Sequence, residues 1–294
     1  MAKAERARDG IWETVQTIFW ALLIAAAFRS VLFQPFSIPS GSMKPTLLVG
    51  DYLFVSKYSY GYSRFSLPFS PNLFDGRIWP GQPQRGDVIV FKHPRQDACS
   101  EGPIDMVVGL AQAVFGRARA GAGDCTDYVK RLVGLPGDQV QVIAGVLHLN
   151  GEPVPTVSEG VFSEEKALRG SPARPPQCNN EPVPLGGECE KELYRETLPG
   201  GREHWVLNTS GTIGDRSNPG LRSGDDTGIF EVPEGHFFFM GDNRDNSIDS
   251  RFPSVGVVPF ENLIGRADII VISSDGAFWE PWKWRASRFF KSIE

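Results

Sequence analysis

The longest apolar stretch of the chain lies near its N-terminus. Residues 18–28 form an unbroken apolar run inside a mostly apolar window, residues 11–33, which follows a polar and basic start at residues 1–10. A helix needs about 20 residues to cross a bilayer, so the window predicts one N-terminal transmembrane helix. The preceding basic residues favour an N-terminus in the cytoplasm and the rest of the chain outside it. A cleaved signal peptide or a buried core helix would show a similar pattern, and both alternatives stay open.

Beyond this window the apolar residues occur in short runs between turns, which is typical of β-strands. The chain has 32 glycines and 23 prolines, so turns are frequent and long helices are disfavoured. The predicted fold class is therefore mainly β, with an antiparallel β-sheet as the main domain. Strands are predicted at residues 52–55, 58–80 (with an extended hairpin), 86–91, around Lys130, 140–149 (a hairpin ending at Asn150-Gly151), 237–240 and 267–272.

Two insertions and a tail depart from this pattern. Residues 104–119 carry apolar side chains at helical spacing, which predicts a short amphipathic helix. Residues 155–226 are rich in Pro, Gly and charge with weak periodicity, which favours an irregular inserted β-subdomain. The main domain then comprises residues 34–154 and 227–275. The tail, residues 276–294, combines three tryptophans with basic residues, and it either lies at a membrane interface or packs onto the β-domain.

Composition and charge narrow the classes of function. Hydrophobic residues make up 41% of the chain and charged residues 22%, which suits a folded domain with a short apolar anchor. A net charge of -5 with scattered basic residues gives no support for nucleic-acid binding. No HExxH motif and no CxxC spacing occur, so we expect neither a metal site nor a cofactor.

Four cysteines, Cys99, Cys125, Cys178 and Cys189, follow the apolar window. An even number of cysteines beyond a membrane-directed segment suits an oxidising compartment. Closure of the shortest loops favours the disulfides Cys99–Cys125 and Cys178–Cys189. Four cysteines allow three connectivities, however, and free buried thiols are a further alternative.

The candidate chemistry begins at Ser42, which lies in the stretch of residues 38–47 directly after the apolar window. A serine hydroxyl is a weak nucleophile until a base removes its proton. No GxSxG motif surrounds Ser42, and the four histidines of the chain read as ordinary surface or strand residues. A serine in a turn that serves only the turn is the alternative interpretation of Ser42.

Lys130 is the predicted base. Strand alternation puts its side chain on one face with Tyr128 and Leu132, where burial would lower its pKa from about 10.4 towards 8. The alternative is a solvated lysine on the surface of a strand. Lys44 is nearer to Ser42 in sequence, but local geometry holds its side chain. We expect it to move no proton, so Lys44→Met should retain most of its activity.

Three separated stretches carry a resemblance to a known family. They are IPSGSMKPTL (38–47), DYVKRLVGLPGD (127–138) and GDNRDNSIDSR (241–251). Together and in this order they resemble bacterial type I signal peptidase, a family of membrane-anchored serine proteases with a Ser/Lys dyad. The resemblance extends from about Phe33 to Asp275, apart from the two insertions. It implies that the main domain is catalytic and removes signal peptides from secretory precursors after small residues, at the outer face of the inner membrane, with precursors and the lipid bilayer as partners.

The resemblance also assigns roles near the cut bond. The backbone N–H of Ser42 and the hydroxyl of Ser40 would stabilise the oxyanion of the tetrahedral intermediate. Shallow apolar pockets would hold the substrate residues before the cut. The residues that the resemblance places in these pockets are Phe36, Ile38, Met43, Leu47, Tyr128 and Val129.

A supporting role falls to the loop at residues 241–251. By resemblance, Ser247 would orient the Lys130 amine, Asp249 and Arg251 would pair to hold the loop, and Asp242 would support it. Two other functions stay open: a self-cleaving protein with a Ser/Lys dyad, against which the apolar N-terminus argues, and a catalytically silent, membrane-tethered binding domain.

Overall fold

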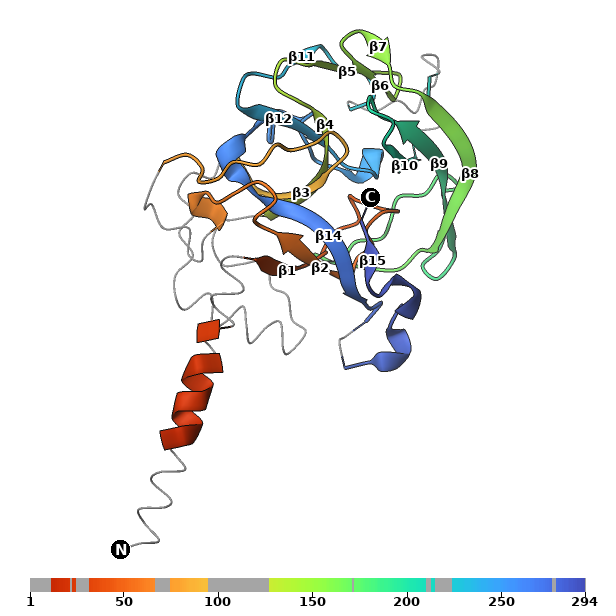
Figure 1. Cartoon of the computed structure of the whole chain (residues 1–294). Coiled ribbons are helices and arrows are strands. Elements are labelled where there is room, and N and C mark those ends of the chain that lie inside the picture. The colour runs from red at the N-terminus through yellow and green to blue at the C-terminus, as the bar shows by residue number, and fades with distance from the viewer. Residues whose placement is uncertain are drawn as a thin grey trace, which may run out of the picture.

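The chain folds into antiparallel β-sheets (Figure 1). This computed structural model describes residues 12–21, 23–24, 32–66, 75–94, 127–170, 172–209, 213–214, 224–276 and 279–293. Within these ranges there are three sheets, of eight, four and three strands. The prediction of a mainly β, antiparallel fold is confirmed.

The eight-stranded sheet has the order β1-β2-β14-β3-β4-β12-β13, with β15 added to β14. Its strands are β1 (Phe33–Ser37), β2 (Asp51–Ser56), β3 (Val88–Lys92), β4 (Asp127–Gly134), β12 (His236–Met240), β13 (Val258–Pro259), β14 (Leu263–Ser273) and β15 (Lys291–Ser292). The four-stranded sheet contains β5 (Gln139–Ile143), β6 (Val146–Leu149), β7 (Glu152–Pro153) and β11 (Phe230–Glu231). The three-stranded sheet contains β8 (Thr156–Glu165), β9 (Glu188–Thr197) and β10 (Glu203–Asn208).

Strand β3 shows why the sequence pattern located the central sheet correctly. All five of its residues are buried, because β14 and β4 flank it and apolar clusters cover both faces. Val88 and Val90 pack into the cluster with Leu53 and Val55, whereas Ile89 and Phe91 pack into the cluster on the other face. Successive side chains of a strand point to opposite faces, so a strand covered on both sides reads as a continuous apolar run.

The other predicted strands are placed as follows. Residues 52–55, 237–240 and 267–272 lie in β2, β12 and β14, Lys130 lies in β4, and the hairpin at 140–149 is formed by β5 and β6. Its turn has positive φ at Ala144 (48°) and Gly145 (80°), as a two-residue hairpin turn requires.

The expectation of strands over residues 58–80 is wrong for the part that the structure describes. That part contains a 3-10 turn at Arg64–Ser66 and a single bridge between Tyr62 and Ile78. A side chain supplies hydrogen bonds in place of those of a β-ladder. Arg77 donates to the carbonyl of Gly61 over 2.8 Å and to that of Phe260 over 2.9 Å. The aromatic content suggested strands, but the backbone is held by a guanidinium.

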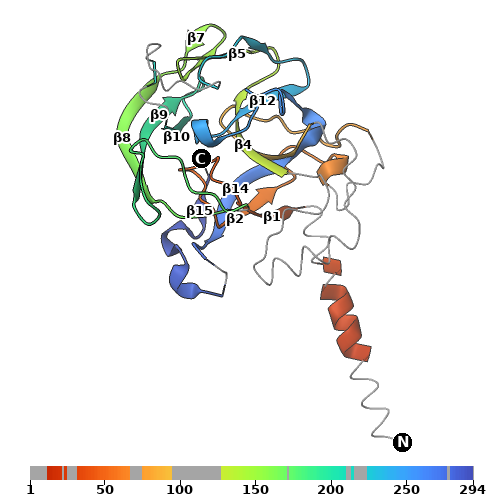
Figure 2. The ribbon, with the colours of Figure 1, turned by 180° about the vertical axis from the view of Figure 1, so that it is seen from behind.

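Residues 155–226, predicted to be an irregular β-subdomain, do contain β-strands, and these are longer and more regular than expected. Strands β8 and β9 have ten residues each and curve around one side of the molecule (Figures 1 and 2). The alternation was hidden because two of the four buried positions of β9 are charged, namely Lys191 and Glu196. A search for apolar periodicity does not detect a strand that buries ion pairs.

The N-terminal segment is helical at residues 12–21 and 23–24. Among the described residues, no helix combines the length and apolar character needed to span a membrane. The predicted helix over residues 11–33 is too long at its end, because Leu32 lies in a turn and Phe33 begins β1. The remainder of that window, the predicted helix at 104–119 and the predicted Cys99–Cys125 disulfide lie outside the described residues.

The tail packs onto the β-domain over residues 279–293. Strand β15 pairs with Ile269 and Ile270 of β14, and Arg288 reaches the buried carboxylate of Asp51. Trp282 is 76% exposed. Of the basic side chains that suggested a lipid contact, Arg288 is therefore used inside the protein.

Candidate active site

Ser42 lies in the turn between β1 and β2, and its backbone is fixed from the loop at residues 241–251. The N–H of Asn243 donates to the Ser42 carbonyl over 3.0 Å, and the Asn243 side-chain amide donates to the Gly41 carbonyl over 2.9 Å. The N–H of Leu47 donates to the Met43 carbonyl over 2.8 Å and closes the turn. Ser42 is 7% exposed, so its hydroxyl is shielded but not sealed.

Strand β4 brings Lys130 to Ser42. Lys130 Nζ donates to Ser42 Oγ over 2.5 Å, and the lysine is 4% exposed. Burial lowers the pKa of Lys130 to about 8, although the carboxylates of Asp249 and Asp242 act in the opposite direction. The Tyr128 ring lies 5.7 Å from the amine. A lysine with this pKa has a substantial neutral fraction at pH values where proteins work, which is what a base requires.

Asp242 joins three segments of the site. Arg131 donates to both of its carboxylate oxygens over 2.8 Å, and the Thr46 hydroxyl donates to one of them over 2.5 Å. Burial alone would raise the pKa of Asp242, but the adjoining guanidinium of Arg131 outweighs burial and keeps that pKa below its ordinary value. Asp242 thereby ties the loop at 241–251 to β4 and to the turn that carries Ser42.

Asp249 and Arg251 are brought together as the resemblance implied. Arg251 Nε and Nη2 each donate to the Asp249 carboxylate over 2.9 Å, and Arg251 Nη2 also donates to the Arg244 carbonyl over 2.6 Å. Asp249 in turn accepts the Gly241 N–H over 2.9 Å. The pair therefore fixes the backbone on both sides of the loop.

Ser247 lies close to Gly241 but does not hold the Lys130 amine. A Cβ atom at Gly241 would come within 2.3 Å of Ser247 Oγ, so only glycine fits there. The Ser247 hydroxyl is buried, and its interaction with the Asp249 carboxylate helps to keep the pKa of that group below its ordinary value. Ser40 is exposed, and its hydroxyl lies 3.4 Å from Ser42 Oγ.

The six predicted pocket residues divide into two groups. Ile38, Met43 and Leu47 are buried in the apolar core beneath the site, with Leu47 0% exposed, so they offer little or no surface to a substrate. The other three are only partly buried and form the accessible apolar surface; they are Phe36, Tyr128 and Val129.

Comparisons with known proteins point to one family. A family model described as signal peptidase, peptidase S26, matches residues 11–272. A signal peptidase I of Rickettsia typhi is 35% identical over 292 residues, which is 93% of this chain and 90% of the relative. A signal peptidase I of Rickettsia prowazekii is 34% identical, with the same shares covered. The chain belongs to the signal peptidase family. It is therefore a serine peptidase, a hydrolase.

A solved signal peptidase I from Enterococcus faecalis is 22% identical, and the match covers 63% of this chain and 96% of that one with a TM-score of 0.27. Family membership rests on the sequence matches, which span most of both chains.

Several contacts of this peptidase site were not found from the sequence. Arg131 and Thr46 hold Asp242, and Arg244 forms a buried ion pair with Glu196 of β9. The available signal for Arg131 was a second basic residue directly after Lys130, followed in β4 by the apolar residues Leu132 and Val133. Glu196 had none, because its partner lies 48 positions away.

Lys44 and the buried histidine His204 are both engaged away from Ser42. Lys44 Nζ forms an ion pair with Glu164 of β8. His204 of β10 is buried with its Nε2 atom 3.3 Å from Glu196, and burial lowers the pKa of its imidazole. His204 is thus a buried strand residue and not a surface one. Lys130 is the amine that the fold delivers to the Ser42 hydroxyl.

Proposed function

We propose that this chain is a membrane-anchored endopeptidase that removes N-terminal signal peptides from secretory precursors, with Ser42 as nucleophile and Lys130 as general base. The observation that carries the proposal is the 2.5 Å contact between Lys130 Nζ and Ser42 Oγ in a site where burial lowers the lysine pKa to about 8. With that pKa about a tenth of the amine is neutral at pH 7, against fewer than about one in a thousand for an ordinary lysine.

The chemistry follows from this pair. The neutral Lys130 amine takes the proton of Ser42 Oγ while the oxygen attacks the scissile carbonyl carbon. The negative charge that develops on the carbonyl oxygen would be stabilised by the Ser42 N–H and the Ser40 hydroxyl. The Lys130 ammonium then gives its proton to the departing amine, which leaves an ester on Ser42. A water molecule, deprotonated by the same lysine, hydrolyses the ester and releases the signal peptide's new carboxylate.

Two features support an extended peptide substrate with small side chains. β1 ends just before the Ser42 turn and pairs only with β2 among the described strands, so its other edge is available for main-chain hydrogen bonds. Phe36, Tyr128 and Val129 offer partly exposed apolar surface near the pair. Relatives described as signal peptidase I accord with secretory precursors as substrates.

The N-terminal helix supports the proposed anchor. Its apolar side chains are exposed; Trp12, Phe19 and Ile24, for example, expose 69%, 57% and 65% of their surface. Exposed apolar side chains on a helix fit a lipid environment better than water. We propose a single crossing of the inner membrane with the β-sheets on the outer side. The division into a catalytic domain (34–154 and 227–275) and an inserted subdomain (155–226) belongs to the same proposal.

The decisive experiment is cleavage of a secretory precursor by purified full-length protein. The wild-type chain should convert the precursor into its mature form, and Ser42→Ala should leave it intact. Ser158→Ala, at an exposed serine of β8, should cleave like wild type. Normal cleavage by Ser42→Ala would exclude Ser42 as the nucleophile. If the wild-type chain and both variants are folded but none of them cleaves the precursor, the result would favour the catalytically silent binding domain.

A further inference from the structure

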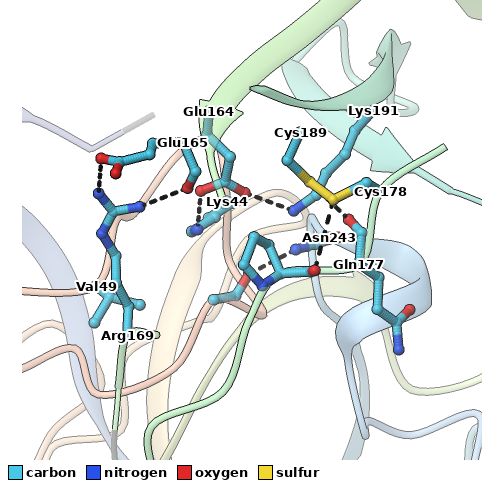
Figure 3. A network of polar contacts seen from close by, with 12 residues as sticks. Lys44, Val49, Glu164, Glu165, Arg169, Gln177, Cys178, Cys189, Lys191 and Asn243 are labelled. Carbon is cyan, nitrogen blue, oxygen red and sulfur yellow. Dashed lines mark hydrogen bonds and ion pairs between the residues drawn. A yellow bond between two sulfur atoms is a disulfide. The ribbon is translucent and has the colours of Figure 1, made fainter. Parts of the chain in front are cut away.

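A buried ion pair begins two residues after Ser42. Lys44 Nζ contacts the carboxylate of Glu164 on β8, and the same carboxylate accepts a hydrogen bond from Lys191 on β9 over 2.7 Å (Figure 3). The three side chains expose only 7%, 11% and 1% of their surface. One carboxylate therefore lies between two ammonium groups in a nearly dry space.

The charges of this cluster are mutually dependent. Burial alone would raise the pKa of Glu164, but Lys191 and Lys44 outweigh it and hold that pKa below its ordinary value. Burial lowers the pKa of Lys44, and Glu164 opposes that change. Removing one partner of a buried pair leaves an uncompensated charge in low dielectric, so the remaining groups rearrange.

The cluster lies where it can control Ser42. Asn243 holds the N-terminal side of the turn through the carbonyls of Gly41 and Ser42, whereas Glu164 holds the C-terminal side through Lys44. Two residues of chain span only about 7 Å. A movement of the Lys44 backbone would therefore also move the backbone of Ser42. Its Oγ lies 2.5 Å from Lys130, a contact that such a shift would lengthen.

Other contacts hold Glu164 itself in place. Cys189, disulfide-bonded to Cys178, lies directly opposite Glu164 in the β8–β9 register (Figure 3). Arg169, which follows β8, donates to both carboxylate oxygens of Asp275 over 2.7 and 2.8 Å. Gly170 approaches so closely that a Cβ there would be 2.3 Å from the Pro39 carbonyl oxygen. The end of the β8–β9 sheet is thus fastened to the main sheet beside the Ser42 turn.

We propose that Glu164 is a positioning residue for the nucleophile: through its ion pair with Lys44 it fixes the distance between Ser42 Oγ and Lys130 Nζ, and Lys191 holds the carboxylate for this task. The proposal rests on the proposed function, in which Ser42 and Lys130 form the catalytic pair. It also changes the expectation for Lys44, which moves no proton yet is not dispensable.

The test measures kcat and KM of the full-length, detergent-solubilised protein on a peptide with an Ala-x-Ala cleavage site. Glu164→Gln and Lys44→Met should each lower kcat about tenfold to a hundredfold with little change in KM, because a misplacement near 1 Å has that effect. Lys44→Arg should retain most of the wild-type kcat. Glu159→Gln is the matched control, since Glu159 lies on the same strand and pairs with Arg195 at the surface.

Two further readouts separate positioning from a general loss of structure. The double variant Lys44→Met/Glu164→Gln should lose no more activity than the worse single variant, because both remove one interaction. The pH dependence of kcat/KM should keep its wild-type limb in Lys44→Met, since the base is unchanged. Multiplying losses in the double variant, or wild-type kcat in Glu164→Gln, would overturn the proposal.

Folding and failure of the premise are separable outcomes. If thermal unfolding shows that Glu164→Gln does not fold, the kcat values of Lys44→Met and Lys44→Arg decide. Equal losses of kcat in both would contradict a role for the positive charge at position 44. If Ser42→Ala is inactive while Glu164→Gln is normal, only the positioning role is overturned. If Ser42→Ala cleaves, the proposed function fails, and the positioning role fails with it.

Discussion

Individual buried charges decide the chemistry of this site, because each lies where water does not solvate it. Burial lowers the pKa of Lys130 to about 8 and so increases the neutral fraction of its amine. Glu164 is also largely buried, but there Lys191 and Lys44 outweigh burial and keep the carboxylate charged. The same loss of water therefore makes an amine easier to deprotonate at one position, whereas at another position two neighbouring ammonium groups keep a carboxylate ionised.

The first prediction concerns the pH dependence of cleavage. Because only the neutral Lys130 amine accepts the Ser42 proton, kcat/KM should rise with pH through a limb near the lysine pKa of about 8. Lys130→Met keeps the apolar stem and should abolish cleavage while the protein stays folded. A limb at about 6.5 would instead indicate an imidazole base, and activity in Lys130→Met would exclude this dyad.

The second prediction concerns stability, which Lys130→Met should increase although it should abolish cleavage. The pKa of Lys130 is about 8 in the folded protein and 10.5 as the ordinary value, so between these pH values the unfolded chain binds more protons and stability rises with pH. Lys130→Met should therefore be more stable than wild type at pH 7, by up to about 3 kcal/mol. Denaturant unfolding at pH 7 and pH 10 measures this, and a gain that does not shrink at pH 10 would contradict it.

At the scale of elements, the C-terminal tail holds the chain segment that follows Ser42 in place. Arg288 donates to the Asp51 carboxylate and, over 2.9 Å, to the Thr46 carbonyl, which lies four residues after Ser42. Asp51 is fully buried and also accepts the Ser273 hydroxyl over 2.6 Å. The basic residue that suggested lipid contact is thus a structural clamp.

The third prediction tests this clamp. Arg288→Met leaves the Asp51 carboxylate buried without its guanidinium and should lower the free energy of unfolding by about 3 kcal/mol. Lys283→Met, which removes the exposed pair with Glu280 in the same tail, should change it by less than about 0.5 kcal/mol. Denaturant unfolding of both variants compares them. Equal changes in the free energy of unfolding would show that Arg288 contributes no more to stability than an exposed ion pair does.

The fourth prediction concerns the disulfide. Cys178 and Cys189 are bonded as local loop closure predicted, and they close a loop with a sequence separation of 11. Replacing both by serine should lower the free energy of unfolding by about 3 kcal/mol, since the unfolded chain gains freedom. Denaturant unfolding measures this loss.

Non-reducing peptide mapping should also find Cys99 joined to Cys125, and a crossed pairing would refute that connectivity.

At the scale of the whole molecule, the proposed function needs two parts: the β-sheets, which carry the catalytic site, and the N-terminal helix, which anchors them to the membrane. A peptidase for exported precursors must act where its substrates emerge from the membrane. Strand β1, which directly precedes the Ser42 turn, begins at Phe33, within the predicted anchor window. The proposed anchor and nucleophile are therefore separated by few residues.

The fifth prediction follows from that arrangement. The protein should stay with membranes after high-salt and alkaline washing, because an inserted helix is held by apolar burial and not by charge. Residues beyond Phe33 should be accessible to protease only from the outer side. A soluble chain that begins near residue 28 would support the cleaved signal peptide instead.

The sequence by itself determined the parts that depend on neighbouring residues. Continuous apolar runs such as 88–91 and 237–240 became central strands, because a strand covered on both faces favours apolar side chains at successive positions. The hairpin at 140–149 followed from alternation and its turn. The family resemblance identified Ser42 and Lys130 as the pair to examine, and the fold places them in contact.

Only the tertiary structure decided which charges meet. Lys44 and Glu164 are 120 positions apart and Asp51 and Arg288 are 237 apart, so no local pattern links them. Strand β9 was missed for the same reason, since its buried positions hold charges whose partners lie elsewhere in the chain. Apolar burial is decided by composition and period along the chain, whereas a buried charge requires one particular partner, and only folding brings that partner near.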